Sequence, residues 1–343
     1  MRSALHRTVV TLAVIVLAGI ALERAGQDAA HAQQAGREVE TIQLRPNFFV
    51  IAGAGANISV QTGPDGAVLV DAGTEARADA VAAAVRAIAD QPIRYIIDTS
   101  ADADHVGGNG KLARAGRSIF AMGPEPLGGE FAKAMTNGFA ASILAAEGVL
   151  LRMSAPTGRP SPFPNDAWPT ETFAESRRDL YFNHEGIQAF RQAAAHSDAD
   201  SIVFFRGSDV IAAGEIVDAT RFPRIDPREG GSIQGEIAAL NHVIEMSVRP
   251  RPLVFQPGGT YIVPAHGHVF DQIDVVEYRD MLVIIRDIVQ DAIDRGLTIA
   301  QVVAAAPAKA YAPQYGSTSG PWTTDDFVKA VYTSLAAKRT RGQ

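Results

Sequence analysis

One short stretch constrains the fold of this chain more than any other. Residues 93–109 read IRYIIDTSADADHVGGN. The branched apolar run Ile93–Ile97 predicts a buried strand, and Asp102, Asp104 and His105 follow soon after it. Polar side chains that come after a strand lie at the edge of a sheet, where α/β proteins place their sites. The stretch therefore predicts an α/β fold with a polar site at this edge, and an acidic turn without a ligand is the alternative.

The residues around this stretch predict antiparallel strands followed by a strand–helix–strand unit. A Pro-Asp-Gly turn separates Ile58–Thr62 from Ala67–Asp71, which predicts a hairpin. An alanine-rich amphipathic helix should follow and stop before Pro92. Beyond the opening stretch we expect a short helix that ends at Gly116 and then a strand at Ser118–Met122.

Residues 123–175 differ from their surroundings in glycine and proline content. Residues 126–153 read as a helix with glycine interruptions, and residues 154–170 are rich in proline, which predicts a loop. We therefore expect an insertion over about residues 123–175. Alternating strands and helices should follow, with the helices at 231–246, Asp274–Arg295, Thr298–Ala306 and Thr324–Ala337.

The N-terminus predicts an export signal. Basic residues precede the apolar run Thr8–Leu22, which is short for a membrane span, and Ala30–Ala32 offers small residues for cleavage. We expect residues 1–32 to be a cleaved signal peptide, with an uncleaved anchor as the alternative. Residues 33–343 should then form a single domain, periplasmic or secreted, with no stable membrane span after cleavage.

Charge and cysteine content exclude other classes of function. The net charge is −7, and the only basic cluster is the short tail at Lys338, Arg339 and Arg341. Phosphate backbones require clustered Lys and Arg, so we expect no nucleic-acid partner. The chain has no cysteine, which excludes disulfides and thiolate ligands. Any metal must be held by His, Asp, Glu, backbone or water.

Several histidines follow predicted strands, as the residues of a sheet-edge site should. These are His105, His196, His266 and His268. They follow three predicted strands, since His266 and His268 come after the same one, and acids lie beside them. This pattern favours a metal site over structural histidines. By contrast, His184 is expected in a hairpin turn and His242 within a helix.

The motifs around these histidines resemble those of the metallo-β-lactamase superfamily. The signature of that family, H-x-H-x-D-H followed by V-G-G-N, aligns with Ser100, Asp102, Asp104 and His105, followed by VGGN. Later motifs align His196 with a further ligand, Glu215 with the usual Asp, and His266 with the last histidine. The resemblance extends from about Val39 to Leu335. It implies a four-layer αββα sandwich with a helical and proline-rich insertion and C-terminal helices.

The same alignment departs from the family in one of its two metal sites. By the resemblance, the second site keeps its ligands: Asp104, His105 and His266, with Glu215 able to reach in. The first keeps only His196 and the shared Glu215, because Ser100 and Asp102 replace two histidines. Asp102 could still supply an oxygen. The resemblance therefore implies one Zn²⁺ ion and a weaker second place, whose oxygen ligands suit Mn²⁺ or Mg²⁺.

Other acids near the motifs are expected outside the metal shell. Asp71 matches a family position near the site, and Asp98 and Asp200 are expected as supporting or capping residues. Asp198 lies close to His196 and is a candidate to compensate for the incomplete first site.

These features imply a metal-dependent hydrolase of a small-molecule substrate. In this hypothesis a metal-bound hydroxide attacks an ester, amide, lactone or related bond, and Asp104 and Glu215 orient it. The alternative is a catalytically degenerate family member that binds a ligand or partner without turnover, since two signature histidines are missing. A third possibility is an acidic binding domain without metal.

Overall fold

Residues 39–119, 139–155, 158–250 and 258–341 are described by the computed structural model, and the chain from Glu40 onward forms one compact unit. The expected export signal, residues 1–32, lies outside the described residues. Within the described ranges, no helix combines the length and the apolar character that a membrane crossing requires.

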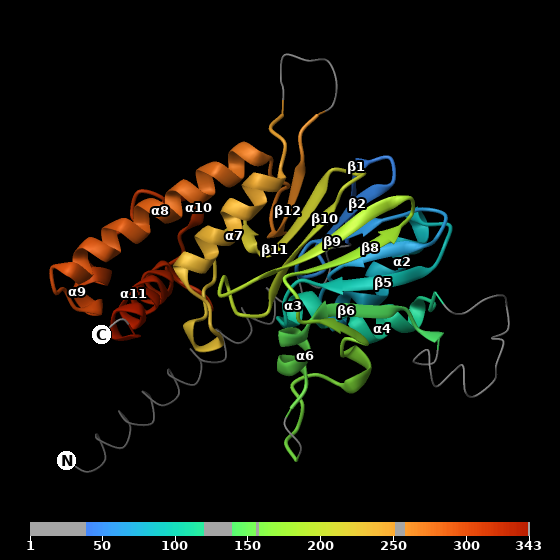
Figure 1. Cartoon of the computed structure of the whole chain (residues 1–343), viewed down its shortest axis with the longest axis horizontal. Coiled ribbons are helices and arrows are strands. Elements are labelled where there is room, and N and C mark those ends of the chain that lie inside the picture. The colour runs from blue at the N-terminus through green and yellow to red at the C-terminus, as the bar shows by residue number, and fades with distance from the viewer. Residues whose placement is uncertain (1–38, 120–138, 156–157, 251–257, 342–343) are drawn as a thin grey trace, which may run out of the picture. The chain divides into compact units, whose positions relative to one another are not determined.

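Two sheets form the centre of this unit (Figure 1). Sheet A contains, in spatial order, β1 (Glu40–Arg45), β2 (Phe48–Ala52), β3 (Ile58–Gln61), β4 (Ala67–Val70), β5 (Ile93–Asp98), β6 (Ser142–Ala146) and β7 (Glu171–Phe173). Sheet B contains β12 (Tyr261–His266), β11 (Val210–Asp218), β10 (Asp200–Phe205), β9 (Glu185–Gln192) and β8 (Arg177–Phe182). Both sheets are mixed: strands β4 to β7 are parallel, as are β11 and β12, and the other neighbours are antiparallel.

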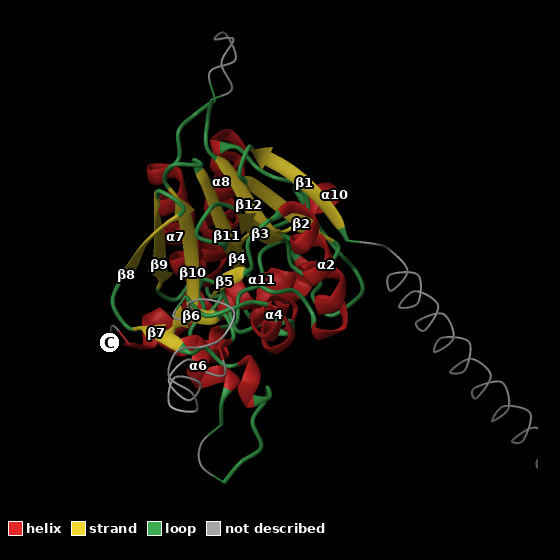
Figure 2. Ribbon diagram, turned by 90° about the vertical axis from the view of Figure 1, so that its right-hand side faces the viewer, coloured by secondary structure: helices red, strands yellow, loops and turns green. Residues whose placement is uncertain are grey.

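Helices flank both sheets (Figure 2). The α-helices are α2 (Ala78–Ile88), α3 (Ala103–Val106), α4 (Asn109–Ala115), α6 (Glu147–Met153), α7 (Ile233–Met246), α8 (Gln272–Asp294), α9 (Ile299–Ala304), α10 (Ala312–Tyr315) and α11 (Thr324–Arg341). Figure 1 shows α2 and α4 on the side of sheet A, and α7, α8 and α11 on the side of sheet B. The expected four-layer αββα sandwich is therefore confirmed.

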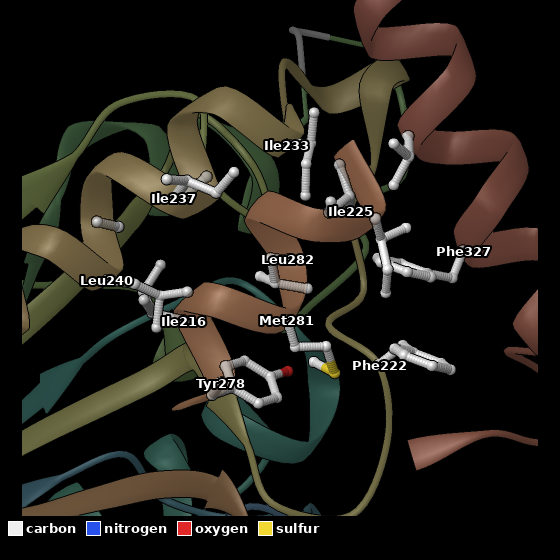
Figure 3. Packing of buried hydrophobic residues seen from close by; sticks show 14 of the residues in the cluster. Ile216, Phe222, Ile225, Ile233, Ile237, Leu240, Tyr278, Met281, Leu282 and Phe327 are labelled. Carbon is white, nitrogen blue, oxygen red and sulfur yellow. The ribbon is translucent and has the colours of Figure 1, made fainter. Parts of the chain in front are cut away.

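Two large hydrophobic cores lie on the two faces of sheet B. The first core lies between the sheets and includes Val70 and Ile97 of sheet A and Val203 of sheet B, all almost completely buried. The second core lies between sheet B and its helices, and includes Leu240 and Leu282 (Figure 3). Burial of such apolar area is the main force that stabilises the sandwich.

The second core also fixes the loop that follows β11. Phe222 of this loop stacks on Phe327 of α11, with ring centroids 4.7 Å apart and an interplanar angle of 2° (Figure 3). Ile225 of the same loop is also buried in this core. The loop therefore holds a defined position, and it carries Arg221 and Arg224 toward the polar site described below.

Two stretches of the sequence are wrongly predicted. The pattern of residues 126–153 predicts a helix, but Ser142–Ala146 forms β6, which pairs in parallel with β5. Alanine favours a helix locally, yet the run is short and buried on both sides, where pairing with β5 decides its conformation. Ser118 and Ile119 form no strand, and residues 120–138 lie outside the described part of the chain. The range expected as an insertion thus contributes β6 and β7 to sheet A.

Candidate metal centre

The candidate residues converge where parallel strands of the two sheets end. The register of β4 and β5 pairs Val70 with Ile97, so Asp71 and the turn after β5 leave the sheet together. In sheet B, the register of β11 and β12 pairs Asp218 with His266. Asn57 joins the two edges, because its side-chain amide donates to the carbonyl oxygens of Pro264 and Gly267 at 3.0 Å each.

The first of two clusters of possible ligands lies at this junction. It consists of Asp104, His105, Glu215 and His266, whose ligand atoms all lie within 4.8 Å of one another. Nε2 of His105 is 3.0 Å from Oε1 of Glu215, and Nε2 of His266 is 3.2 Å from Oδ2 of Asp104. Thus α3, β11 and β12 each contribute a side chain to one small volume.

Two buried residues orient His105. Oδ2 of Asp71 lies 2.9 Å from Nδ1 of the imidazole, and Thr99 donates to Asp71 through both its backbone N–H and its hydroxyl. A carboxylate at Nδ1 favours the tautomer with the proton on Nδ1, which leaves the lone pair of Nε2 for the cluster. Such an arrangement prepares His105 as a metal ligand.

Glu215 is placed by a bend in β11. Gly214 before it has φ +53°, and a Cβ at this position would lie 2.5 Å from Oγ1 of Thr99. Only glycine fits both the left-handed backbone and the close contact. The bend accompanies a register shift in the β11–β12 pairing and directs the buried carboxylate of Glu215 to the cluster.

The second cluster consists of Asp102, His196 and the shared Glu215. Nε2 of His196 lies 2.9 Å from Oδ2 of Asp102. Nδ1 of His196 lies 2.6 Å from the backbone carbonyl oxygen of Arg224. A carbonyl oxygen only accepts, so Nδ1 of His196 carries the proton and donates it, as Nδ1 of His105 does to Asp71. The second cluster has one imidazole and two carboxylates, fewer nitrogen ligands than the first.

The separations within the first cluster fit a bound ion. Two ligands that each lie about 2.0–2.1 Å from a tetrahedral Zn²⁺ are about 3.3 Å apart. Three of the separations are 3.0, 3.2 and 3.7 Å, and all ligand atoms of the cluster lie within 4.8 Å of one another. Moreover, Nε2 of His266, a member of this cluster, is buried without a hydrogen bond of acceptable geometry, although Asp104 lies near it. An unpaired buried nitrogen beside two carboxylates suits a bound cation.

Comparison with known families decides the assignment. The model of the metallo-β-lactamase superfamily matches residues 52–266, a range that holds every residue of both clusters. The chain belongs to the metallo-β-lactamase superfamily. Its buried His/Asp/Glu cluster is typical of this superfamily, and membership indicates a metallo-hydrolase.

The chain is also similar in fold to solved structures. The chain is similar to Pisa1, a stereoselective inverting sec-alkylsulfatase from Pseudomonas sp., with 12% identity and a TM-score of 0.61; the match covers 88% of this chain and 51% of that one. It is also similar to the metallo-beta-lactamase from Pontibacter korlensis, with 14% identity, a TM-score of 0.49, and coverage of 71% and 98%. The chain therefore spans about half the length of the sulfatase. No curated protein matches the chain.

The structure separates residues of the altered superfamily signature. Asp102 reaches the second cluster, whereas Ser100 belongs to neither cluster and accepts a hydrogen bond from the backbone N–H of Asp102. The expectation that Asp198 compensates for the incomplete site is wrong, because its carboxylate is largely exposed and pairs with Arg152 at 2.7 Å.

The remaining predicted residues have supporting or peripheral places. Asp200 accepts from Ser197 and caps the turn before β10, and Asp98 accepts from Asn109. The position of Asp71 beside His105, outside the clusters, agrees with its expected role. His268 is exposed in the turn after β12, and it lies outside both clusters.

One residue at the site is not predicted from the sequence. Arg224 lies 3.6 Å from Asp102 through its guanidinium, while its carbonyl accepts from His196. It belongs to no motif and lies in the loop after β11. The only signal is its position in the loop that follows the strand of Glu215, which is too weak to select it.

The clusters strongly perturb the titration of their members. Burial lowers the pKa of His196, but Asp102, Asp200 and Glu215 outweigh this effect and raise the pKa to about 10. Burial likewise lowers the pKa of His266, and the pairs with Asp104 and Glu215 raise it to about 9. Without an ion, these imidazoles therefore carry protons at neutral pH. Metal binding must release those protons, so affinity rises with pH.

These shifts predict how the stability of the metal-free protein depends on pH. A histidine whose pKa is raised on folding stabilises fully below its unfolded pKa of about 6.5. The stabilisation declines as pH rises through the folded pKa values, about 10 for His196 and about 9 for His266. We expect the Tm of chelator-treated protein to fall steadily between about pH 6.5 and about pH 10. A Tm that is constant or rises over this range would contradict the protonated clusters.

Proposed function

We propose that this chain is an exported, metal-dependent hydrolase that holds one zinc ion at Asp104, His105 and His266, with Glu215 close by and one position left open for water. The orientation of His105 is the observation that carries this proposal. Asp71 binds Nδ1, and Nε2 faces Glu215 at 3.0 Å, so the imidazole lone pair is directed into the cluster. Two imidazoles and one carboxylate are a normal ligand set for a catalytic Zn²⁺, and they leave a fourth position for water.

The second cluster supports a weaker place for an ion. It offers one imidazole and two carboxylates, and Asp102 already has His196 and Arg224 as partners. An ion that binds there must compete with both cations. Its oxygen-rich donors suit Mn²⁺ or Mg²⁺ better than Zn²⁺. We therefore propose a mononuclear zinc centre as the working state.

The proposed chemistry assigns distinct roles to the carboxylates. When bound, zinc lowers the pKa of a coordinated water toward roughly 7 and stabilises negative charge on a substrate oxygen. Asp104 has the more accessible carboxylate, with 33% of its side chain exposed against 3% for Glu215. Asp104 therefore accepts a hydrogen bond from the attacking water and orients it toward an ester, amide, lactone or related bond. Glu215 holds His105 and His266 in place.

Zinc content tests the mononuclear centre directly. We expect protein purified without added metal to contain one equivalent of zinc per chain, because only the first cluster has a full donor set. Inductively coupled plasma mass spectrometry gives this ratio. Two equivalents would mean that Asp102 completes a second site. No metal would contradict the proposal and favour a family member that binds a ligand without turnover.

The test for hydrolytic turnover needs a broad panel of substrates, since the fold hosts many reactions. Esters, lactones, amides, phosphodiesters and sulfate esters cover the proposed bond classes; sulfate esters are included because Pisa1 is an alkylsulfatase. Activity that disappears with chelator and returns with zinc supports the proposal. Activity that is indifferent to chelator contradicts it. Export is tested by cell fractionation and N-terminal sequencing, with cleavage after Ala32 as the expected result.

A further inference from the structure

A small cavity adjoins the second cluster. Its volume is about 290 Å³, and its walls are Arg221, Arg224, Ile225, Asp226, Pro321 and Trp322. Arg224 connects cavity and cluster, because its guanidinium lies 3.6 Å from Asp102 and its carbonyl accepts from His196. The backbone N–H of Asp226 also donates to the carbonyl of His196 at 2.9 Å. The cavity is therefore beside the candidate metal centre.

The two arginines of the cavity differ in how firmly they are held. Nε of Arg221 lies 2.5 Å from Oδ2 of Asp218, a buried carboxylate that thereby neutralises it. Arg224 has Asp102 as an ion-pair partner at 3.6 Å, which is too long for a hydrogen bond. Asp102 also pairs with His196, whose Nε2 lies 2.9 Å from Oδ2 of Asp102. Within the described part of the chain, the guanidinium of Arg224 donates no hydrogen bond to protein, and 45% of the side chain is exposed.

The other walls of the cavity are mostly apolar. Trp322, Pro321 and Ile225 come from the segments that pack on the second core, and the indole N–H of Trp322 donates to the carbonyl of Phe222 at 3.2 Å. Trp322 is thereby fixed with its ring at the cavity. Asp226 is the only acid of the wall, and its carboxylate accepts from the backbone of Arg228 as a helix cap. This hydrogen bond fixes one oxygen of Asp226 but leaves its negative charge, so Arg224 has to supply the attraction for any anion in the cavity.

We propose that this cavity binds an anionic substituent of the substrate, a carboxylate, sulfate or phosphate group, through the guanidinium of Arg224. Planar guanidinium donors match such oxyanions in pairs. Trp322 and Pro321 contact the apolar part next to the anion. The volume suits one substituent and not a whole substrate, so the bond to be cleaved extends toward Asp104. This inference rests on the proposed hydrolase function, and it names the substrate class of that site.

Binding is measurable without turnover. The chain has two tryptophans, Trp168 and Trp322, so W168F makes Trp322 the single fluorescent reporter. The probes are phenyl phosphate, phenyl sulfate, phenylacetate and the neutral phenylacetamide. We expect at least one anionic probe to change the emission of Trp322 and to bind at least about tenfold more tightly than phenylacetamide. Equal binding of the neutral probe, or no binding of any probe, overturns the proposal.

Matched arginine variants identify the contact. R224Q should weaken binding of the preferred probe by about 10- to 100-fold, whereas R228Q should not change it. Arg228 is exposed in the same loop and is no part of the cavity wall, so this control removes the same charge nearby. Binding that R224Q leaves unchanged overturns the proposal.

Parallel titrations with zinc-loaded and chelator-treated protein separate this inference from the proposed function. Anion binding that needs zinc but not Arg224 places the anion on the ion, which sinks the inference and leaves the hydrolase proposal intact. Binding that needs Arg224 in both forms supports the inference. If the protein binds the anion through Arg224 but neither retains zinc nor turns over any substrate, the hydrolase proposal fails while the anion site stands.

Discussion

Replacing His105 by alanine is expected to remove the zinc ion and to lower hydrolysis by about 10³-fold or more. The imidazole is fully buried, its Nε2 faces Glu215, and Asp71 holds it from behind. Loss of one nitrogen donor leaves a site with too few ligands to retain Zn²⁺ at low concentration. D104A should act in the same direction, because Asp104 belongs to the same cluster. Zinc content after dialysis and the rate with any substrate found in the panel measure both effects.

Two controls make this result specific. D102A should retain one equivalent of zinc, because Asp102 belongs to the second cluster alone. H242A removes an imidazole of α7 that contacts Gln192 and belongs to neither cluster, and it should leave zinc content unchanged. If D102A loses the ion while D104A and H105A keep it, the principal site has been assigned to the wrong cluster.

Most helices and strands are accessible from the sequence, because periodicity and turn chemistry act locally, whereas the four-layer arrangement is implied by the family resemblance. The helix predicted at Asp274–Arg295 lies close to the observed α8, Gln272–Asp294, since its apolar face repeats over many turns. Ser142–Ala146 could not be assigned in this way. Its five small and apolar residues suit a helix or a buried strand equally, and only the place beside β5 decides between them.

The candidate site shows the same division between local and long-range information. The motifs predict Asp104, His105, Glu215 and His266 as ligands, and these four residues lie in one cluster in the structure. The pairing of His196 with Asp102 depends instead on how the loops of two sheets meet. Arg224 reaches this pair only because Phe222 and Ile225 anchor its loop in the second core. Such a tertiary constraint leaves no pattern in the sequence.

Replacing Asp71 by asparagine is expected to weaken zinc binding by about 10- to 100-fold with little change in the fold. The introduced amide would still accept from Thr99 through its oxygen, but its nitrogen would face Nδ1 of His105 and could only donate. The proton of the imidazole would then move to Nε2, which removes the lone pair from the cluster. Competition with a chromogenic zinc chelator measures the loss of affinity.

The backbone makes this substitution a clean one. Asp71 has φ +66°, and asparagine tolerates this left-handed region as well as aspartate does. Asp209 provides the matched control: it has φ +54° and accepts from the hydroxyl of Thr260 at 2.7 Å, and it belongs to neither cluster. D209N should bind zinc like the unaltered protein. Equal affinity of D71N and D209N would show that Asp71 does not set the tautomer of His105.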